Sequence, residues 1–214
     1  MEDAGITADI QALVKQGVIR TDAESKDEVA VRTGVLLSHL VLTAKTAPKA
    51  DTLARLAAVK TGFVAMGAGN DIPRTIDDLT ARLNNDAING ADLVKELDDL
   101  ARVLVPEVSY EAGPRCVPLI QAGGWLAGTH VVAGAISNSG KIDAATALLR
   151  RPEVVAYFLK VVKSEGSGST VGPGVLGKLE TALLKLQEVS GKPTLSKEDV
   201  DAVYSTTGDV LGLL

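Results

Sequence analysis

The feature that most constrains the fold of this chain is an uncharged, glycine-rich run from Cys116 to Gly140. Its 25 residues carry no charged side chain, and they contain "QAGGWLAGTHVVAGAI" with the only tryptophan of the chain. Such a run is long enough to cross a bilayer as a helix. Its polar residues and many glycines lower its hydrophobicity, however, and the chain has no second comparable run and no aromatic belt. We therefore expect no transmembrane span; the alternative, a membrane-inserting helix over residues 116–136, predicts a protein that needs detergent.

Helical geometry favours a buried helix over residues 114–137. At about 100° per residue, apolar or small side chains lie on every side of it, which is typical of a helix surrounded by other helices. Gly124 and Gly128 would allow a neighbouring backbone to approach closely beside the bulk of Trp125. The segment "VLLSHLVL" has the same all-round apolar character, and it predicts a second buried helix over residues 29–45.

Capping signals and helical periodicity recur along the rest of the chain. Ser25 with Glu28, and Ser196 with Asp199, are typical of helix starts. Aromatic residues make up only 3%, so the core must be aliphatic, which favours helices over sheets. The sequence predicts an all-α fold, an irregular bundle of about nine or ten helices around the two buried ones. We expect residues 1–214 to form a single domain, with a Gly/Ser-rich loop over 166–174 and the last two helices packed on the rest.

Charge and cysteine content exclude several classes of protein. Lys and Arg total 22 and Asp and Glu total 27, a net charge of −5, and the basic residues are scattered. Nucleic-acid binding needs a basic stripe with stacking aromatics, so we expect no nucleic-acid partner. Cys116 is the only cysteine, which excludes an internal disulfide and a cysteine-based metal cage. The sequence leaves the identity of a protein or small-molecule partner open, and a homo-oligomer as well.

The two histidines, His39 and His130, fall one on each of the predicted buried helices. Neither has an Asp, Glu or Cys three or four residues away, as a local metal site would need, so we expect no metal site. Structural burial is the favoured interpretation. The alternative is a small-ligand or metal-binding pocket, and with it an enzyme, formed by His39, Gln121, Trp125 and His130.

Catalytic and cofactor signatures are weak. "GPGVLGK" at 172–178 satisfies G-x-G-x-x-G and the first seven places of a P-loop, but Leu179 stands where Ser or Thr would hold Mg²⁺. Both motifs need a strand that leads directly into the glycines, and none is expected there. Nucleophile motifs such as G-x-S-x-G are absent from the sequence. We therefore predict no cofactor and no catalytic residue, and the sequence favours a binding module over an enzyme.

Several motifs resemble a group of uncharacterised, all-helical bacterial proteins, mostly exported and often lipid-anchored. That group shares a Gly-Gly-Trp-aliphatic-x-Gly helix, matched here by residues 123–128, and a Gly-led apolar segment, to which "TGVLLSHLVLTA" is similar. The "GAGNDI" turn and the later "LNN" fall in a similar order, so the resemblance covers roughly residues 30–135. It implies a helical fold and an exported location.

The chain departs from that group at polar positions. Ala127 stands where the group has an acidic residue, Thr129 and His130 where it has an aromatic, and His39 where it has an Asp. The start "MEDAGITADIQ" has no apolar segment of a signal peptide. We expect a non-enzymatic binding or scaffold protein, periplasmic or envelope-associated if an export signal was removed, and cytoplasmic otherwise.

Overall fold

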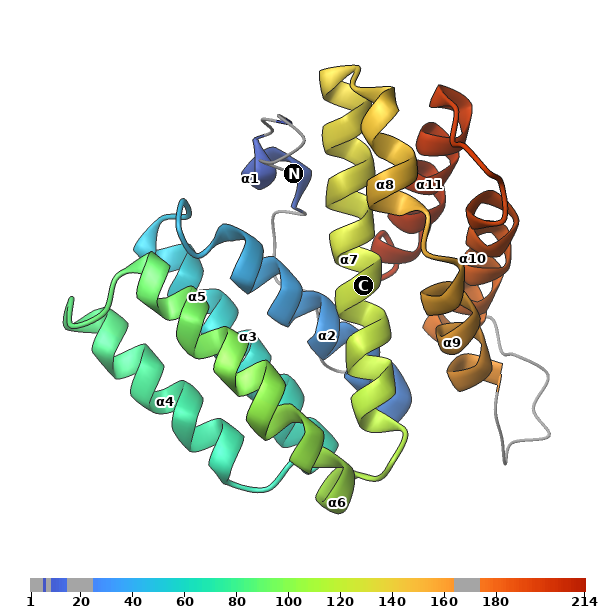
Figure 1. Ribbon diagram of the computed structural model, residues 1–214. Coiled ribbons are helices and arrows are strands. Elements are labelled where there is room, and N and C mark those ends of the chain that lie inside the picture. The colour runs from blue at the N-terminus through green and yellow to red at the C-terminus, as the bar shows by residue number, and fades with distance from the viewer. Residues whose placement is uncertain (1–5, 7–8, 15–24, 164–173) are drawn as a thin grey trace. The chain divides into compact units, whose positions relative to one another are not determined.

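The computed structural model describes residue 6 and residues 9–14, 25–163 and 174–214 (Figure 1). The regular elements among these residues are all helices, so the predicted all-α, multi-helix fold is confirmed. The loop predicted over 166–174 lies outside the described residues except for Gly174. The chain divides into two compact units: a central unit, Val14–Trp125, and a terminal unit formed by Met1–Leu13 with Leu126–Leu214. The single-domain expectation stays a prediction.

The central unit is built from helices that follow one another through short turns. Helix α3 packs against both α2 and α4, and α5 packs against α2. A π-helical turn (η2) and a 3-10 turn (η3) join α5 to α6, and the first part of α7 completes the unit. The bounds are α2 Lys26–Thr43, α3 Lys49–Met66, α4 Asp71–Asn84, α5 Gly90–Asp99, η2 Leu100–Leu104, η3 Val105–Glu107, α6 Val108–Ala112 and α7 Cys116–Ser139.

Local sequence signals account for most of these helix ends. The hydroxyl of Ser25 accepts a hydrogen bond from the Glu28 amide at 3.3 Å, which confirms Ser25 as the cap of α2. Helix α3 follows Pro48 and ends at Gly67, whose φ of +79° closes the helix in the left-handed conformation that glycine adopts without strain. Helix α4 differs slightly from expectation, because Asn70 rather than Asp71 occupies its cap position.

Helices α2 and α7 cross at very short range inside the central unit. A Cβ atom added to Gly34 would lie 1.9 Å from the carbonyl oxygen of Ile120, and one added to Gly123 would lie 2.0 Å from that of Val31. Both positions therefore require glycine. The glycine-mediated approach was expected at Gly124 and Gly128, but a Cβ at Gly128 would meet nothing within 4 Å. Gly124 does lie against α2, because a Cβ there would be 3.4 Å from the Gly34 carbonyl oxygen, so the expectation is right for Gly124 and wrong for Gly128.

The terminal unit packs its last three helices side by side, with α10 against both α9 and α11. Helix α11 begins with the predicted capping box, in which Ser196 accepts from the Asp199 amide and Asp199 accepts from the Ser196 amide. The unit's elements are α1 Ile10–Leu13, the second part of α7, η4 Ile142–Ala144, α8 Ala145–Leu149, α9 Pro152–Lys163, α10 Val175–Ser190 and α11 Lys197–Leu211.

Within the described residues, α7 is the one helix long and apolar enough to cross a membrane. In its most apolar window, 67% of the residues are buried. Burial of this extent is typical of the core helix of a folded protein, and a helix of that kind passes the same length and composition test. The absence of a membrane span therefore stays a prediction.

Candidate functional site

The structure divides the four residues of the predicted pocket between the two units. His39 is 2% exposed on α2, and Gln121 and Trp125 lie on α7, all in the central unit. Gln121 is exposed and Trp125 half-buried, and they share one face of α7 because they are one helical turn apart. His130 belongs to the terminal unit. A single pocket that combines all four residues stays a prediction.

His130 is held in one orientation by α11. Its Nδ1 lies 3.0 Å from the Thr207 hydroxyl and 3.2 Å from the Tyr204 carbonyl oxygen, and its ring stacks on the Tyr204 ring with centroids 4.3 Å apart. The Thr207 hydroxyl donates to the Val203 carbonyl, so it accepts from Nδ1–H; this network assigns the proton to Nδ1. Burial lowers the pKa of His130, which favours the neutral imidazole.

Other candidate chemistry has structural roles. The part of the chain that the structure describes holds no group of three or more His, Cys, Asp or Glu side chains able to bind a metal ion. The Cys116 thiol is buried and donates to the Ala112 carbonyl, and burial raises its pKa, so it is a poor nucleophile. The last described element before the P-loop-like motif is helix α9, which ends at Lys163, and Leu179 is buried in α10. Its residues 172 and 173 lie outside the described part.

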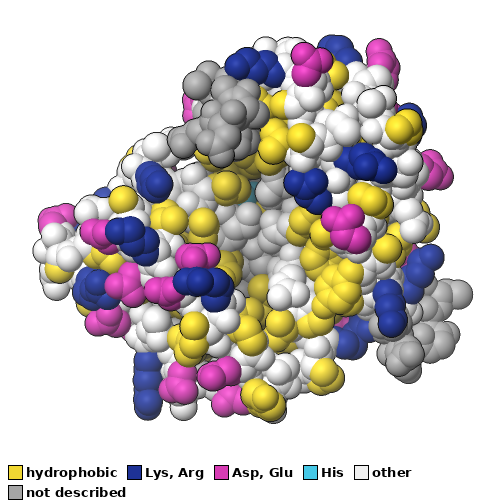
Figure 2. Space-filling view, viewed as in Figure 1, with side chains coloured by type: hydrophobic (Ala, Val, Ile, Leu, Met, Phe, Trp, Pro, Cys, Tyr) yellow, Lys and Arg dark blue, Asp and Glu magenta, His cyan; other side chains and the backbone are white. Residues whose placement is uncertain are grey.

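The sequence did not predict a pocket of about 210 Å³ in the central unit, where α3 ends, α4 begins and α6 follows η3. Its apolar wall consists of Ala68, Ile72, Leu104 and Val108. The remaining lining residues are three acidic ones, Asp71, Glu107 and Glu111, and Tyr110. Figure 2 shows acidic side chains next to hydrophobic ones over α6, at the lower edge of the view.

Two backbone features bring these residues together. The turn between α3 and α4 passes through Gly67 and Gly69, with φ of +79° and +62°. The Glu111 carboxylate lies directly over this turn, because a Cβ added to Gly69 would be 2.0 Å from its Oε2. Glu107 and Glu111 are four residues apart across η3 and α6, so helical spacing places them on one face.

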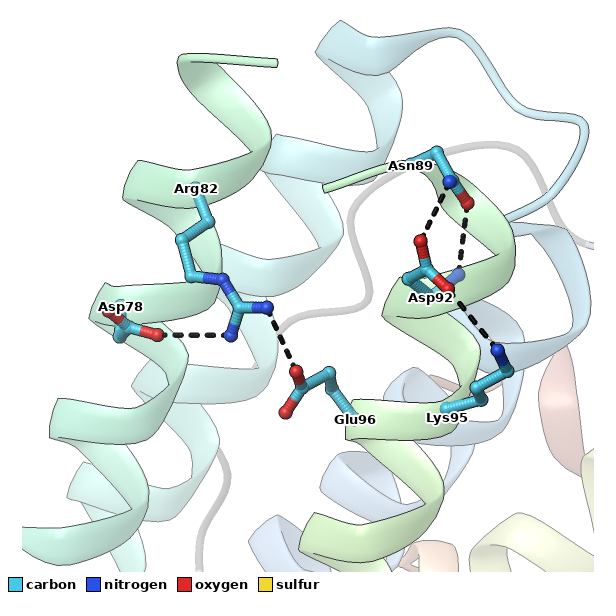
Figure 3. Close-up of polar contacts among 6 residues, drawn as sticks. All are labelled: Asp78, Arg82, Asn89, Asp92, Lys95 and Glu96. Atoms are coloured by element: carbon cyan, nitrogen blue, oxygen red, sulfur yellow. Dashed lines mark hydrogen bonds and ion pairs between the residues drawn. The ribbon is translucent and has the colours of Figure 1, made fainter. Parts of the chain in front are cut away.

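The three pocket carboxylates have no cationic partner among the described residues. Elsewhere in the central unit ion pairs are frequent: Arg82 contacts Asp78 at 3.4 Å and Glu96 at 2.9 Å, joining α4 to α5 (Figure 3). Other carboxylates with a cationic partner are Asp27, Asp77, Asp86, Asp92, Asp98 and Asp99.

The carboxylates of Asp71, Glu107 and Glu111 form no ion pair or hydrogen bond with any described residue, and no Lys, Arg or His lines the pocket. Lys26 approaches the same turn, with its Nζ 3.8 Å from a Cβ built at Gly67, but it is not part of the lining. The pocket is thus a concave, negatively charged surface with an apolar wall.

Sequence reasoning missed this pocket because its two halves, residues 68–72 and 104–111, are distant in sequence. The available signals were the paired glycines of "GAGND" and the two glutamates that flank Tyr110 in "PEVSYEAG". Neither signal says which turn meets which helix, so no spacing rule predicts their contact. The chain matches no protein-family model, no curated protein and no solved structure. The structure alone therefore defines the class of protein, which is an all-α protein of two compact units.

Proposed function

We propose that this protein is a non-enzymatic binding protein whose ligand occupies the pocket between α4 and α6. The observation that carries the proposal is a concave surface in which unpaired carboxylates stand beside an apolar wall. Surface pockets with an apolar lining and a few polar groups are the usual form of ligand sites. The unpaired carboxylates give such a site polarity and a preferred orientation for what it binds.

The size and the rim of the pocket favour binding of a small group. Its volume of about 210 Å³ is below the roughly 300–1,000 Å³ typical of sites that enclose a whole drug-sized ligand. It fits one side-chain-sized group. Tyr110 is 90% exposed at the edge of the pocket, and exposed tyrosines of this kind are enriched where proteins contact partners. The lining has no hydroxyl–histidine or thiol–histidine pair that would support nucleophilic catalysis.

An exported location is the second part of the proposal, and the resemblance of residues 30–135 to exported helical proteins supports it. The test is expression of the complete gene in its host, followed by release of the periplasmic contents and separation of the membranes. Recovery in the periplasmic or membrane fraction is expected. Recovery only with the cytoplasmic marker enzymes would overturn this part and leave the binding role to be tested separately.

The binding role is tested by nuclear magnetic resonance of the isotope-labelled protein with a mixed library of cationic, neutral and anionic fragments. Backbone amide shifts at Ala68, Ile72 and Val108 are expected to change on addition of at least one fragment. Tyr110→Ala should weaken that response without affecting folding, because the Tyr110 side chain is 90% exposed. A library in which no fragment perturbs the pocket, or turnover of ester, phosphate or peptide substrates by the protein, would overturn the proposal.

A second candidate is a ligand or metal site that uses His130. The observation in its favour is the fixed orientation of the His130 ring. Because Nδ1–H donates a hydrogen bond to α11, the lone pair of Nε2 can bind a ligand or a metal ion. Native mass spectrometry of the untagged protein, with a denatured control, tests it. Extra mass that disappears on denaturation and is lost in His130→Phe supports this site, whereas an unmodified mass in both proteins counts against it.

A further inference from the structure

We propose that the peptide bond between Asn89 and Gly90, at the start of α5, is a site of spontaneous deamidation, and that the cap of α5 controls when the reaction takes place. This inference is independent of the pocket and of the proposed function.

The two residue types make the reaction possible. The peptide nitrogen that follows an asparagine can attack the side-chain carboxamide, and glycine leaves that nitrogen unobstructed because it has no Cβ. Asn89 and Gly90 form the one Asn-Gly pair of the sequence, since the other asparagines are followed by Asp, Asn or Ser. Asn89 is exposed, so the water that the reaction consumes can reach it.

The reaction has two steps. The Gly90 nitrogen forms a bond to Cγ of Asn89, the bond from Cγ to Nδ2 breaks, and Nδ2 leaves as ammonia with the proton of the Gly90 amide. Water then opens the resulting five-membered succinimide ring. Opening at one carbonyl gives aspartate, and opening at the other gives isoaspartate, in which the main chain runs through the former side chain. One water is taken up and one ammonia is released, so no oxidant or reductant is needed.

The cap of α5 holds the carboxamide in a geometry that prevents the attack (Figure 3). Oδ1 of Asn89 accepts from the amides of Ala91 and Asp92 at 2.9 and 3.0 Å, and Nδ2 donates to Oδ2 of Asp92 at 2.7 Å. The ψ angle of Asn89 is 173°. At that angle the Gly90 nitrogen is staggered against Cβ of Asn89, whereas the flat ring needs the two atoms eclipsed. The cap must therefore open before deamidation, and the rate of deamidation reports that opening.

The packing of Gly90 distinguishes the two products. A Cβ added to Gly90 would lie 2.2 Å from the Ala44 carbonyl oxygen and 3.0 Å from Cα of Lys45, so the start of α5 fits closely against the end of α2. Isoaspartate lengthens the main chain before Gly90 by one methylene group, which this fit does not accommodate. Aspartate keeps the main chain unchanged, and it caps helices as well as asparagine does. The isoaspartyl product therefore releases the start of α5, whereas the aspartyl product retains it.

The experiment follows deamidation of the full-length chain at pH 8.5 and 37 °C, with the protein folded or unfolded in guanidinium chloride. Peptide mass spectrometry locates the gain of one dalton and distinguishes isoaspartate from aspartate. We expect Asn89 to be modified before any other asparagine. The rate should be at least tenfold lower in the folded protein, because only the fraction with an open cap reacts.

Two variants test the control by the cap. Asp92→Ala removes the acceptor of Nδ2 and should raise the rate in the folded protein about fivefold, the equivalent of one exposed hydrogen bond. Lys95→Ala is the matched control, because it removes the 3.3 Å ion pair to Oδ1 of Asp92 and leaves the contact with Nδ2 in place. Its rate should equal that of the wild-type protein. Urea unfolding of each variant separates opening of the cap from global unfolding.

The products are compared by their Tm values. Asn89→Asp reproduces the aspartyl product and should unfold within about 4 °C of the wild-type protein, whereas the isoaspartyl fraction, isolated by ion exchange, should unfold at a lower temperature than that. A first modification at another asparagine, or equal rates in the folded and unfolded chains, would overturn the proposal. Equal rates for Asp92→Ala and Lys95→Ala, or an isoaspartyl fraction with the wild-type Tm, would do the same.

Discussion

Replacement of Gly123 by alanine tests the closest helix crossing of the central unit. The added methyl group would be placed 2.0 Å from the Val31 carbonyl oxygen and 2.9 Å from its carbonyl carbon. Both are backbone atoms of α2, so no side-chain rotation relieves the clash, and the helices must separate. Overpacking of this kind costs about 1–3 kcal/mol, against which alanine regains up to about 1 kcal/mol of helix propensity. We expect a net destabilisation of about 1–2 kcal/mol.

A matched control lies on the same helix. A Cβ at Gly128 would meet nothing within 4 Å, so Gly128→Ala should show the propensity gain alone, about 0.5–1 kcal/mol of added stability. The assay is thermal unfolding followed by circular dichroism at 222 nm. For a chain of this size 1 kcal/mol corresponds to about 2–4 °C in Tm, so the two variants should shift Tm in opposite directions. Equal shifts would show that the crossing is not as close as the structure has it.

Three further substitutions test packing, capping and titration. Phe63→Ala removes a fully buried ring of α3 and should cost about 3–5 kcal/mol in urea unfolding; a loss below 1 kcal/mol would contradict that burial. Ser196→Ala removes the cap of α11 and should cost about 1 kcal/mol by the same measurement, and no change would refute the capping role. Burial lowers the pKa of His130 in the folded state, so its contribution to stability is complete above the unfolded-state pKa and is lost as the pH falls below that value. His130→Gln should therefore reduce the fall of Tm between about pH 7 and 5. An unchanged pH profile of Tm would assign the acid sensitivity to other groups.

Much of the fold could be predicted because helix ends are local. Ser25, Pro48 and Ser196 are recognised from their immediate neighbours, and each stands at the helix start that the sequence indicated. The apolar stripe of α4, with Ile76, Leu79 and Leu83, is buried as its spacing predicts.

Features that depend on the partner helix could not be predicted in this way. Which glycine of α7 is in contact depends on where α2 crosses it, and the sequence of α7 has candidates at 123, 124 and 128. The π-helical turn Leu100–Leu104 has the same apolar spacing as an α-helix, so periodicity does not distinguish them. The acidic pocket could not be predicted for the same reason. It forms where the turn between α3 and α4 meets α6, about forty residues later in the chain.

The uncharged character of α7 follows from its membership of both units. In the central unit its glycines must approach the backbone of α2, and a charged side chain would have no room there. In the terminal unit a Cβ at Gly134 would lie 2.7 Å from the Tyr204 ring and from Leu13, and His130 stacks on the same ring. The buried positions in each half of the helix are therefore restricted to small or neutral residues by a different set of neighbours. Two sets of packing constraints therefore act on one continuous helix and favour small, neutral residues along its buried positions.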